Sequence, residues 1–217
     1  MRTKICGIYS VEDIGVALRA GADALGFLVG ITHLAEDKIS IEDAKNLIDK
    51  LPPFVSTVAV THLTKVNEII ELVKLLGVTT LQIHDYIPPE DVKCVKNSLP
   101  GIKIIKAVHV MDNDSLNVAK SFEPFVDAIL LDSRTKDRLG GTGMTHDWNI
   151  SEQIVKQVNR PVILAGGLTA DNVNEAVKKV RPFGVDVNSG VETDKRKDFK
   201  KVSKFILDAK RAEIEYS

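Results

Sequence analysis

The sequence is poor in several features, and each shortage argues against a class of protein. Aromatic residues make up only 5% of the 217 residues, which argues against a surface that stacks sugars or single-stranded nucleic acid. Lys and Arg total 29 while Asp and Glu total 30, so the net charge is -1. With no excess of either charge, neither nucleic acid nor a membrane surface is expected as the main partner.

Cysteine and long apolar runs are also scarce. Cys6 and Cys94 are the only cysteines and form no CxxC motif, which argues against a zinc finger and a disulfide framework. The N-terminal segment lacks the apolar stretch of a signal peptide. No run reaches the ~18 apolar residues that suggest a membrane span. We therefore expect a globular, cytoplasmic protein.

What the chain does have is a regular alternation of short apolar runs and amphipathic stretches. The runs are typical of strands buried on both faces. They are Lys4–Gly7, Ala24–Val29, Val55–Val60, Thr80–Ile83, Lys103–Val108, Ala128–Leu131, Val162–Ala165 and Gly184–Val187. The stretches between them predict helices. These are Val11–Ala20, the segment from Ser40 to the Pro52–Pro53 stop, Val66–Leu76, the segment opened by Pro88–Pro89, Asp114–Ser121, Ile150–Val158, Ala170–Val180 and Lys195–Arg211.

Eight strands, each followed by a helix, imply a parallel sheet with crossover helices. An open doubly wound sheet usually needs only about five or six strands, so eight strands favour closure into a barrel. The length is close to the lower limit of such barrels, ~200 residues, and no linker divides the chain. We expect an α/β protein with one domain over residues 1–217, an eight-stranded parallel (β/α)8 TIM barrel.

The chemistry of such a barrel lies at the carboxyl ends of its strands, where Cys6 and Asp132 stand out. Cys6 ends the first strand and is either a proton-abstracting base, if its thiolate is favoured, or a small buried hydrophobic residue. Asp132 ends a wholly apolar strand and is either a cap for the next loop or a catalytic acid. Its apolar setting should raise its pKa, which suits a proton donor.

Two glycine-containing turns follow the last two strands, and they are Gly166–Gly167 and Ser189–Gly190. Phosphate sites in these barrels use the same two loops and the N-terminus of a short extra helix. Either turn alone would be explained by the ordinary need for glycine in turns. Together they predict a phosphorylated ligand. A third glycine-rich segment, Gly140–Gly143, lies in the long irregular stretch Ser133–Trp148 and is either a hinge or a flexible turn.

The histidines carry different expectations. Gln82 and His84 lie at the end of the fourth strand, where both side chains could point inward to bind a ligand, and His33 and His62 lie near the ends of the second and third strands. His109 and His146 are expected to be structural or solvated. No pair of histidines has metal-ligand spacing such as HxxxH, so no metal site is expected.

Several segments together resemble the phosphoribosylanthranilate isomerase family over nearly the whole chain, in order. They are Lys4–Ile8, Gly21–Phe27, Leu51–Val55, Leu130–Ser133, Gly140–Gly143 with Asp147–Trp148, Leu164–Leu168, Arg181–Glu192 and Lys197–Asp198. The resemblance implies an Amadori rearrangement in tryptophan biosynthesis, in which N-(5-phosphoribosyl)anthranilate becomes an aminoketose. It implies a small phosphorylated substrate, no cofactor or metal, and a monomer or homodimer.

The resemblance also implies a role for each candidate residue. Asp132 would be the general acid that opens the furanose ring, and Cys6 the general base that takes the C2 proton. The phosphate would be held by Gly166, Gly167, Ser189 and Gly190. The remaining substrate-binding residues would be Gln82, His84, Asp186, His33 and His62.

Three segments depart from the family pattern: the loop after the second strand, Val58–Leu63 and Gln82–Asp85, where the family's glycine is lost. The loop after the second strand usually carries an arginine for the anthranilate carboxylate, but residues 26–39 contain none and include Glu36 and Asp37. His33, His62, Lys38 or Arg134 could replace it. Alternatively, the substrate is a different phosphorylated amino sugar, or the chain is a non-catalytic barrel that binds a phosphorylated ligand.

Overall fold

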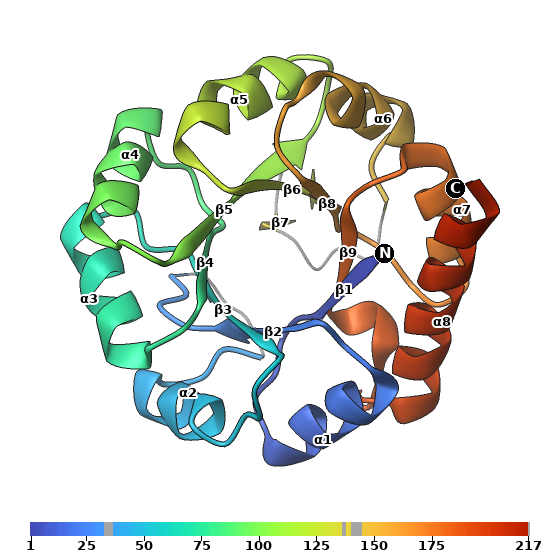
Figure 1. Cartoon of the computed structure of the whole chain (residues 1–217), viewed down its shortest axis with the longest axis horizontal. Helices are drawn as coiled ribbons and strands as arrows, with labels where there is room; N and C mark the ends of the chain where they lie inside the picture. The colour runs from blue at the N-terminus through green and yellow to red at the C-terminus, as the bar shows by residue number, and fades with distance from the viewer. Residues whose placement is uncertain (33–36, 136–137, 140–144, 217) are drawn as a thin grey trace.

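The computed structural model describes residues 1–32, 37–135, 138–139 and 145–216. Within these residues, eight parallel strands form a closed barrel (Figure 1), as the sequence predicts. They pair in the order β5-β4-β3-β2-β1-β9-β8-β6, and a β5–β6 pairing closes the ring. Their bounds are β1 Arg2–Ile5, β2 Ala24–Leu28, β3 Ser56–Thr61, β4 Thr80–Ile83, β5 Lys103–Val110, β6 Ala128–Thr135, β8 Val162–Leu164 and β9 Gly184–Val187.

The α-helices surround the ring of strands (Figure 1). They are α1 Val11–Ala20, α2 Ile41–Ile48, α3 Val66–Leu76, α4 Pro89–Ser98, α5 Ser115–Phe122, α6 Trp148–Gln157, α7 Val173–Val180 and α8 Phe199–Tyr216. The predicted bounds of α1 and α3 are confirmed. Local sequence fixes these ends, because Ser10 caps α1 through the amide of Asp13 and left-handed glycines, Gly21 and Gly77, end both helices.

Several helix starts differ from the prediction, and α6, for example, begins at Trp148 instead of Ile150. The helix expected from residue 170 begins only at Val173, because Thr169 forms a local turn in which its hydroxyl accepts from the amide of Asp171. Such Ser/Thr turns compete with helix formation at helix entrances.

Two antiparallel hairpins were also missed. Strand β6 runs on into the segment predicted to be irregular and pairs with β7 Arg138–Leu139. A second hairpin, β10 Glu192–Thr193 with β11 Arg196–Lys197, occupies the start of the last predicted helix. Its turn residues Asp194 and Lys195 have φ angles of 49° and 62°, so the chain cannot be right-handed helix there.

The core has two parts. A large apolar cluster lies between the strands and the helices. A smaller cluster lies apart from it and consists of Ile105, Ala107, Ala128, Leu130 and Ala165. The members of the smaller cluster alternate along β5 and β6, as expected where every second residue faces the barrel interior. Among the described helices, none combines the length and apolarity needed to cross a membrane.

Candidate active site

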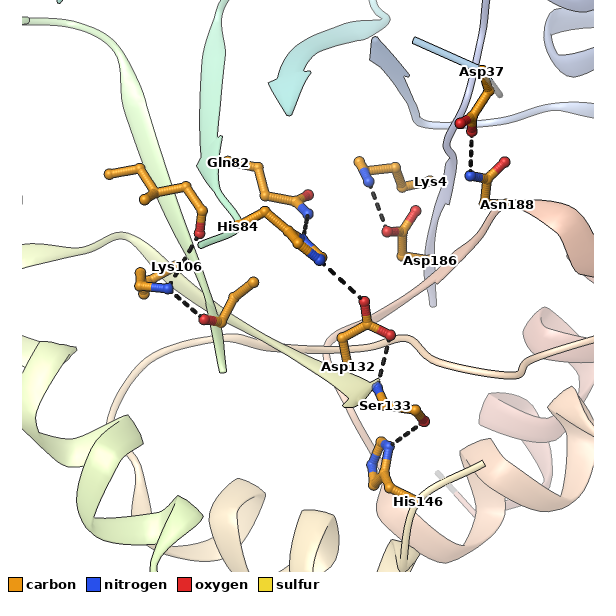
Figure 2. Close-up of polar contacts among 12 residues, drawn as sticks. Lys4, Asp37, Gln82, His84, Lys106, Asp132, Ser133, His146, Asp186 and Asn188 are labelled. Carbon is orange, nitrogen blue, oxygen red and sulfur yellow. Dashed lines mark hydrogen bonds and ion pairs between the residues drawn. The ribbon is translucent and has the colours of Figure 1, made fainter. Parts of the chain in front are cut away.

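Side chains alternate along each strand, so every second residue faces the barrel interior, and several of these residues near the mouth are polar. On β1 the inward-facing residue Lys4 lies two positions before Cys6, and it is paired in register with Asp186 of β9. Lys4 Nζ donates to Asp186 Oδ2 at 2.7 Å, and both residues are buried (Figure 2). The other carboxylate oxygen, Asp186 Oδ1, is buried without a hydrogen bond among the described residues. It is therefore available to a donor from a ligand.

Cys6 follows β1 directly, and its amide donates to the carbonyl of Val187 at 2.9 Å. The thiol is close-packed, because a Cβ at Gly26 would lie 2.8 Å from the Cys6 sulfur. Burial raises the pKa of the Cys6 thiol to about 11, although the Lys4 ammonium opposes this shift. The protonated thiol therefore dominates at neutral pH unless a further positive charge approaches.

Asp132 lies on β6, paired in register with His109 of β5. Its Oδ1 accepts from the amide of Ser133 at 2.7 Å, and its Oδ2 lies 3.6 Å from His84 Nε2 (Figure 2). Burial raises the pKa of Asp132 to about 7, with a further contribution from the carboxylate of Asp186. The predicted upward shift is confirmed, and it keeps a substantial protonated fraction near neutral pH.

Gln82 and His84 are brought together as predicted. The Gln82 amide nitrogen lies 3.3 Å from His84 Nδ1, while Gln82 Oε1 is buried without a hydrogen bond among the described residues. Burial, followed by the neighbouring His109 and His62, holds the pKa of His84 well below its ordinary value. His84 is therefore a neutral imidazole. If Nδ1 accepts from Gln82, Nε2 carries the proton and faces Asp132.

His84 is flanked by His62, which directly follows β3, and by His109 of β5. The rings of His62 and His84 stack with centroids 5.0 Å apart, and the His109 ring meets His84 edge-on at 5.1 Å. The expectation that His109 is merely structural or solvated therefore misses its position in the mouth. Ligand atoms of His84, His109 and Asp132 all lie within 4.8 Å of one another. A search for spacing in sequence does not detect this group, because each residue comes from a different strand.

The other residues that could replace the missing arginine are less well placed than His62 or lie outside the residues that the structure describes. His33 lies outside the described residues, as does the segment from Gly140 to Gly143. Lys38 is exposed. The loop instead places Asp37 near Cys6, where its Oδ2 accepts from Asn188 Nδ2 at 2.5 Å (Figure 2). This part of the mouth is therefore acidic.

The two glycine-containing turns lie against each other. A Cβ on Gly190 would meet the carbonyl oxygen of Leu168 at 1.9 Å, so the turn after β9 packs on the loop after β8. Gly166 and Gly167 have φ angles of 81° and 65°, and the backbone there requires glycine. Ser189 opens a short 3-10 helix, η2 Ser189–Val191. The turn that contains Ser189 and Gly190 is therefore itself a single turn of 3-10 helix.

A buried lysine holds this region in place. Lys197 Nζ donates to the side-chain oxygen of Asn188 at 2.7 Å and to Glu192 Oε1. The Lys197 amide donates to Asp13 of α1 at 3.2 Å. These bonds join the loop after β9 to the first helix, and through Asn188 to Asp37. They fix the backbone on which Ser189 and Gly190 lie.

Comparison with known proteins identifies the family. A family of N-(5'-phosphoribosyl)anthranilate (PRA) isomerases matches residues 3–208. The N-(5'-phosphoribosyl)anthranilate isomerase 2 of Methanosarcina mazei is 44% identical over 213 residues, covering 97% of this chain and 94% of its own. The chain belongs to the PRA isomerase family.

Solved structures of PRA isomerases agree with this membership. The enzyme from Thermotoga maritima has a TM-score of 0.86 and 35% identity, covering 97% of this chain and 99% of its own. A second PRA isomerase structure, in complex with reduced 1-(o-carboxyphenylamino)-1-deoxyribulose 5-phosphate, has a TM-score of 0.83 and 33% identity over the same shares. The predicted barrel and the predicted isomerase family are thus both confirmed.

Sequence reasoning gave no role in the site to two polar residues at the mouth of the barrel. Lys4 is two positions from Cys6 and His109 is two positions from inward-facing Ala107, so the period of two was a usable signal for both. His146, expected from the sequence to be structural or solvated, has its ring between the hydroxyls of Ser133 at 3.0 Å and Ser151 at 2.6 Å. Burial lowers the pKa of His146 to about 4. Its neutral ring therefore ties β6 to α6, which agrees with the structural role predicted for it.

Proposed function

We propose that this chain isomerises N-(5'-phosphoribosyl)anthranilate to 1-(2-carboxyphenylamino)-1-deoxyribulose 5-phosphate in the cytoplasm. The observation that carries the proposal is the pairing of a buried carboxyl of raised pKa, Asp132, with the thiol of Cys6 across the Lys4–Asp186 ion pair. The substrate-analogue complex of a related isomerase supports a phosphorylated ligand. Residues 1–217 would act as one domain.

Asp132 supplies the first proton. Its protonated carboxyl donates to the ring oxygen of the aminoaldose, the bond from C1 to that oxygen breaks, and the nitrogen lone pair forms a protonated Schiff base. A pKa of about 7 suits this step, because the acid is then both populated and able to release its proton. His84 lies 3.6 Å from the resulting carboxylate and can donate to it through Nε2.

Cys6 accepts the second proton. Its thiolate removes the C2 hydrogen from the Schiff base, which gives an enolamine. Protonation of that enolamine at C1, with loss of the proton of its C2 hydroxyl to solvent, then yields the ketose. The thiol has a pKa of about 11 without substrate, which would make it a weak source of thiolate. The Schiff base is cationic, however, and a positive charge next to a buried thiol stabilises its thiolate form. Lys4 adds a second positive charge at the same point.

The opposite end of the substrate would bind at the glycine turns. Backbone amides of Gly167, Ser189 and Gly190 can approach phosphate oxygens closely, because no side chain intervenes at the two glycines. Gly167 and Ser189 belong to loops that are partly or fully open to solvent. Asp186 Oδ1 and Gln82 Oε1 are buried acceptors without hydrogen bonds among the described residues, and would receive the sugar hydroxyls.

For the anthranilate carboxylate we propose His62. It is buried at the end of β3 and stacks on His84. It lies on the side of the mouth from which the family arginine is missing. An imidazolium there would donate a charge-assisted hydrogen bond, worth roughly 1.5–3 kcal/mol.

Turnover can be followed directly by anthranilate fluorescence. We expect the purified protein to convert the substrate and to restore growth of a tryptophan auxotroph that lacks this isomerase. A Cys6→Ser variant is the matched control, since it keeps the size of the side chain and removes the soft thiolate. A folded wild-type protein with no turnover and no growth rescue would overturn the proposal.

Asp37 favours a second candidate function. A carboxylate near Cys6 would repel the substrate's carboxylate, so the same acid and base could serve a phosphorylated amino sugar without one. This alternative would be established by two results together. The protein turns over such a sugar and loses that activity in Asp132→Asn, and it is inactive on the anthranilate compound.

A further inference from the structure

We propose that His84, His109 and Asp132 form a binding site for a divalent transition-metal ion such as zinc, and that the bound metal inhibits the isomerase. The inhibition rests on the proposed function, because it requires Asp132 to be the general acid. The binding does not, since it depends only on the arrangement of the three side chains.

The geometry of the three residues is close to that of a metal site. One potential ligand atom from each lies within 4.8 Å of the other two, and the residues come from the neighbouring strands β4, β5 and β6. His109 and Asp132 are directly paired across β5 and β6. Zinc bonds to nitrogen and oxygen of about 2.0–2.2 Å place tetrahedral ligands roughly 3.3–3.6 Å apart. Side-chain movements that shift each ligand atom by about an ångström would therefore bring the three atoms to zinc-binding distances without a change in the backbone.

The donor set selects the class of metal. Two imidazoles and one carboxylate suit zinc, nickel, cobalt and copper, whereas calcium and magnesium prefer oxygen ligands alone. Imidazole binds metal only when neutral, and His84 is buried beside the other two ligands. Three protein ligands would leave a fourth position for water or for the substrate.

Gln82 can orient the His84 ring for metal binding through a hydrogen bond to Nδ1. Ligating histidines usually donate their second ring N–H to an acceptor, which fixes the ring and raises its basicity. The Gln82 side-chain amide lies at His84 Nδ1. Turning the amide by 180° would let Oε1 accept from Nδ1–H, and that oxygen is buried without a hydrogen bond among the described residues. With its proton on Nδ1, His84 would have a lone pair on its own Nε2 with which to bind the metal.

A metal in this position would block catalysis. Asp132 cannot carry a proton while its carboxylate ligates a cation, so the ring-opening step would lose its acid. His84 would lose its contact with the carboxylate as well. Inhibition should therefore appear at one equivalent of zinc and disappear when a chelator is added.

The test is a titration of the metal-free protein with zinc chloride against a chromophoric chelator, without substrate. We expect one equivalent to bind with micromolar affinity, and magnesium chloride to show no competition. His109→Asn should weaken zinc binding at least tenfold. Two variants serve as controls and should bind zinc as the wild type does. They are His62→Asn, which removes the stacked ring outside the trio, and Cys94→Ser, which removes an exposed thiol.

Equal zinc affinity of His109→Asn and the wild type would overturn the proposal, as would the absence of binding by the wild type. The cobalt(II) complex of the wild type gives a measurement that needs no variant. Intense visible absorption typical of four-coordinate cobalt supports the site, and the weak spectrum of the hydrated ion contradicts it. Activity measured in chelator tests the proposed function separately, so a chain that binds zinc but never turns over would refute only that function.

Discussion

The two sides of the barrel mouth are built in different ways. On the side of β8 and β9, the site consists of backbone turns whose shape requires glycine. Gly190 is packed so tightly that a Cβ would meet the Leu168 carbonyl at 1.9 Å. On the side of β3 to β5, the site consists of side chains, namely the stacked rings of His62 and His84 with His109 edge-on.

The difference explains why one side follows the family pattern and the other departs from it. A backbone turn that holds phosphate cannot accept a side chain, because the added atoms would occupy the space of the turn or of the ligand. A side-chain site is less constrained, since another group can present the same charge from a neighbouring strand. In this chain, the arginine expected in the loop after β2 is absent, and histidines gather on the next three strands.

Asp132 lies where the two sides meet, and Asp132→Asn should have the largest effect. We expect kcat to fall roughly 10²–10⁴-fold, the range for loss of a general acid. The substitution should not destabilise the protein at pH 8, because the folded-state pKa is raised from 3.8 to about 7. A raised carboxyl pKa favours the folded state at low pH, and that advantage is lost as the pH rises through 7.

Steady-state kinetics and thermal unfolding at pH 8 check both parts. The wild-type kcat/KM should also decline as the pH rises above about 7, where the acid form is lost. An asparagine variant that keeps more than a tenth of the activity would show that another group donates the proton.

His62→Asn tests the histidine side of the mouth. We expect KM to rise roughly 10–100-fold with a much smaller change in kcat, because a charge-assisted hydrogen bond to the carboxylate is worth about 1.5–3 kcal/mol. The measurement is steady-state kinetics by fluorescence. Lys38→Met is the matched control, since it removes an exposed cation from the loop after β2. If Lys38→Met raises KM and His62→Asn does not, the carboxylate lies over the loop instead.

Gly190→Ala tests the glycine side. The added Cβ would meet the carbonyl oxygen of Leu168, so the two turns must separate. We expect a loss of about 1–3 kcal/mol in the free energy of unfolding, the usual range for overpacking, together with a higher KM. Gly15→Ala is the control, because its Cβ would meet only the end of Arg19 at 3.7 Å in α1. It should stabilise the protein slightly, and chemical denaturation distinguishes the two.

Most of the fold can be predicted from the sequence, because the strands are buried on both faces and appear as separate apolar runs. Both bounds of α1 and the end of α3 follow from their caps. The β10–β11 hairpin could not be predicted in the same way. Its turn residues Asp194 and Lys195 adopt left-handed angles without any glycine, and the same residues read equally well as the start of a helix.

The candidate site is predictable only in part. Cys6, Asp132 and the glycine turns lie at strand ends, which the sequence locates. Their neighbours depend on which residues of two strands are paired, and the sequence does not give that register. His109 lies beside Asp132 for this reason, and Lys4 beside Asp186. The charge state of each group follows from burial, which is known only once the barrel has closed.

Lys106 is a buried charged residue on β5 that lies outside the barrel mouth. It lies on β5 between inward-facing Ile105 and Ala107, so it faces the helices, where Nζ donates to the Ala107 carbonyl at 2.6 Å and lies over the Phe122 ring. Burial lowers its pKa to about 8. The pKa shift of Lys106 is larger than that of Cys6. Its charge contributes to the lowered pKa of His84, but its Nζ donates to the backbone carbonyls of Ile83 and Ala107 and not to Asp132 or Cys6.

We therefore expect Lys106→Met to leave kcat and KM unchanged and to stabilise the protein at pH 7 by about 1–3 kcal/mol, as replacement of a buried charge often does. The sign follows from the pKa: between about 8 and 10.5 the unfolded chain binds more protons, so the wild type gains stability as the pH rises. The advantage of the variant should shrink over that range. Denaturation at pH 7 and pH 10 measures it, and a loss of activity would place Lys106 in the working site.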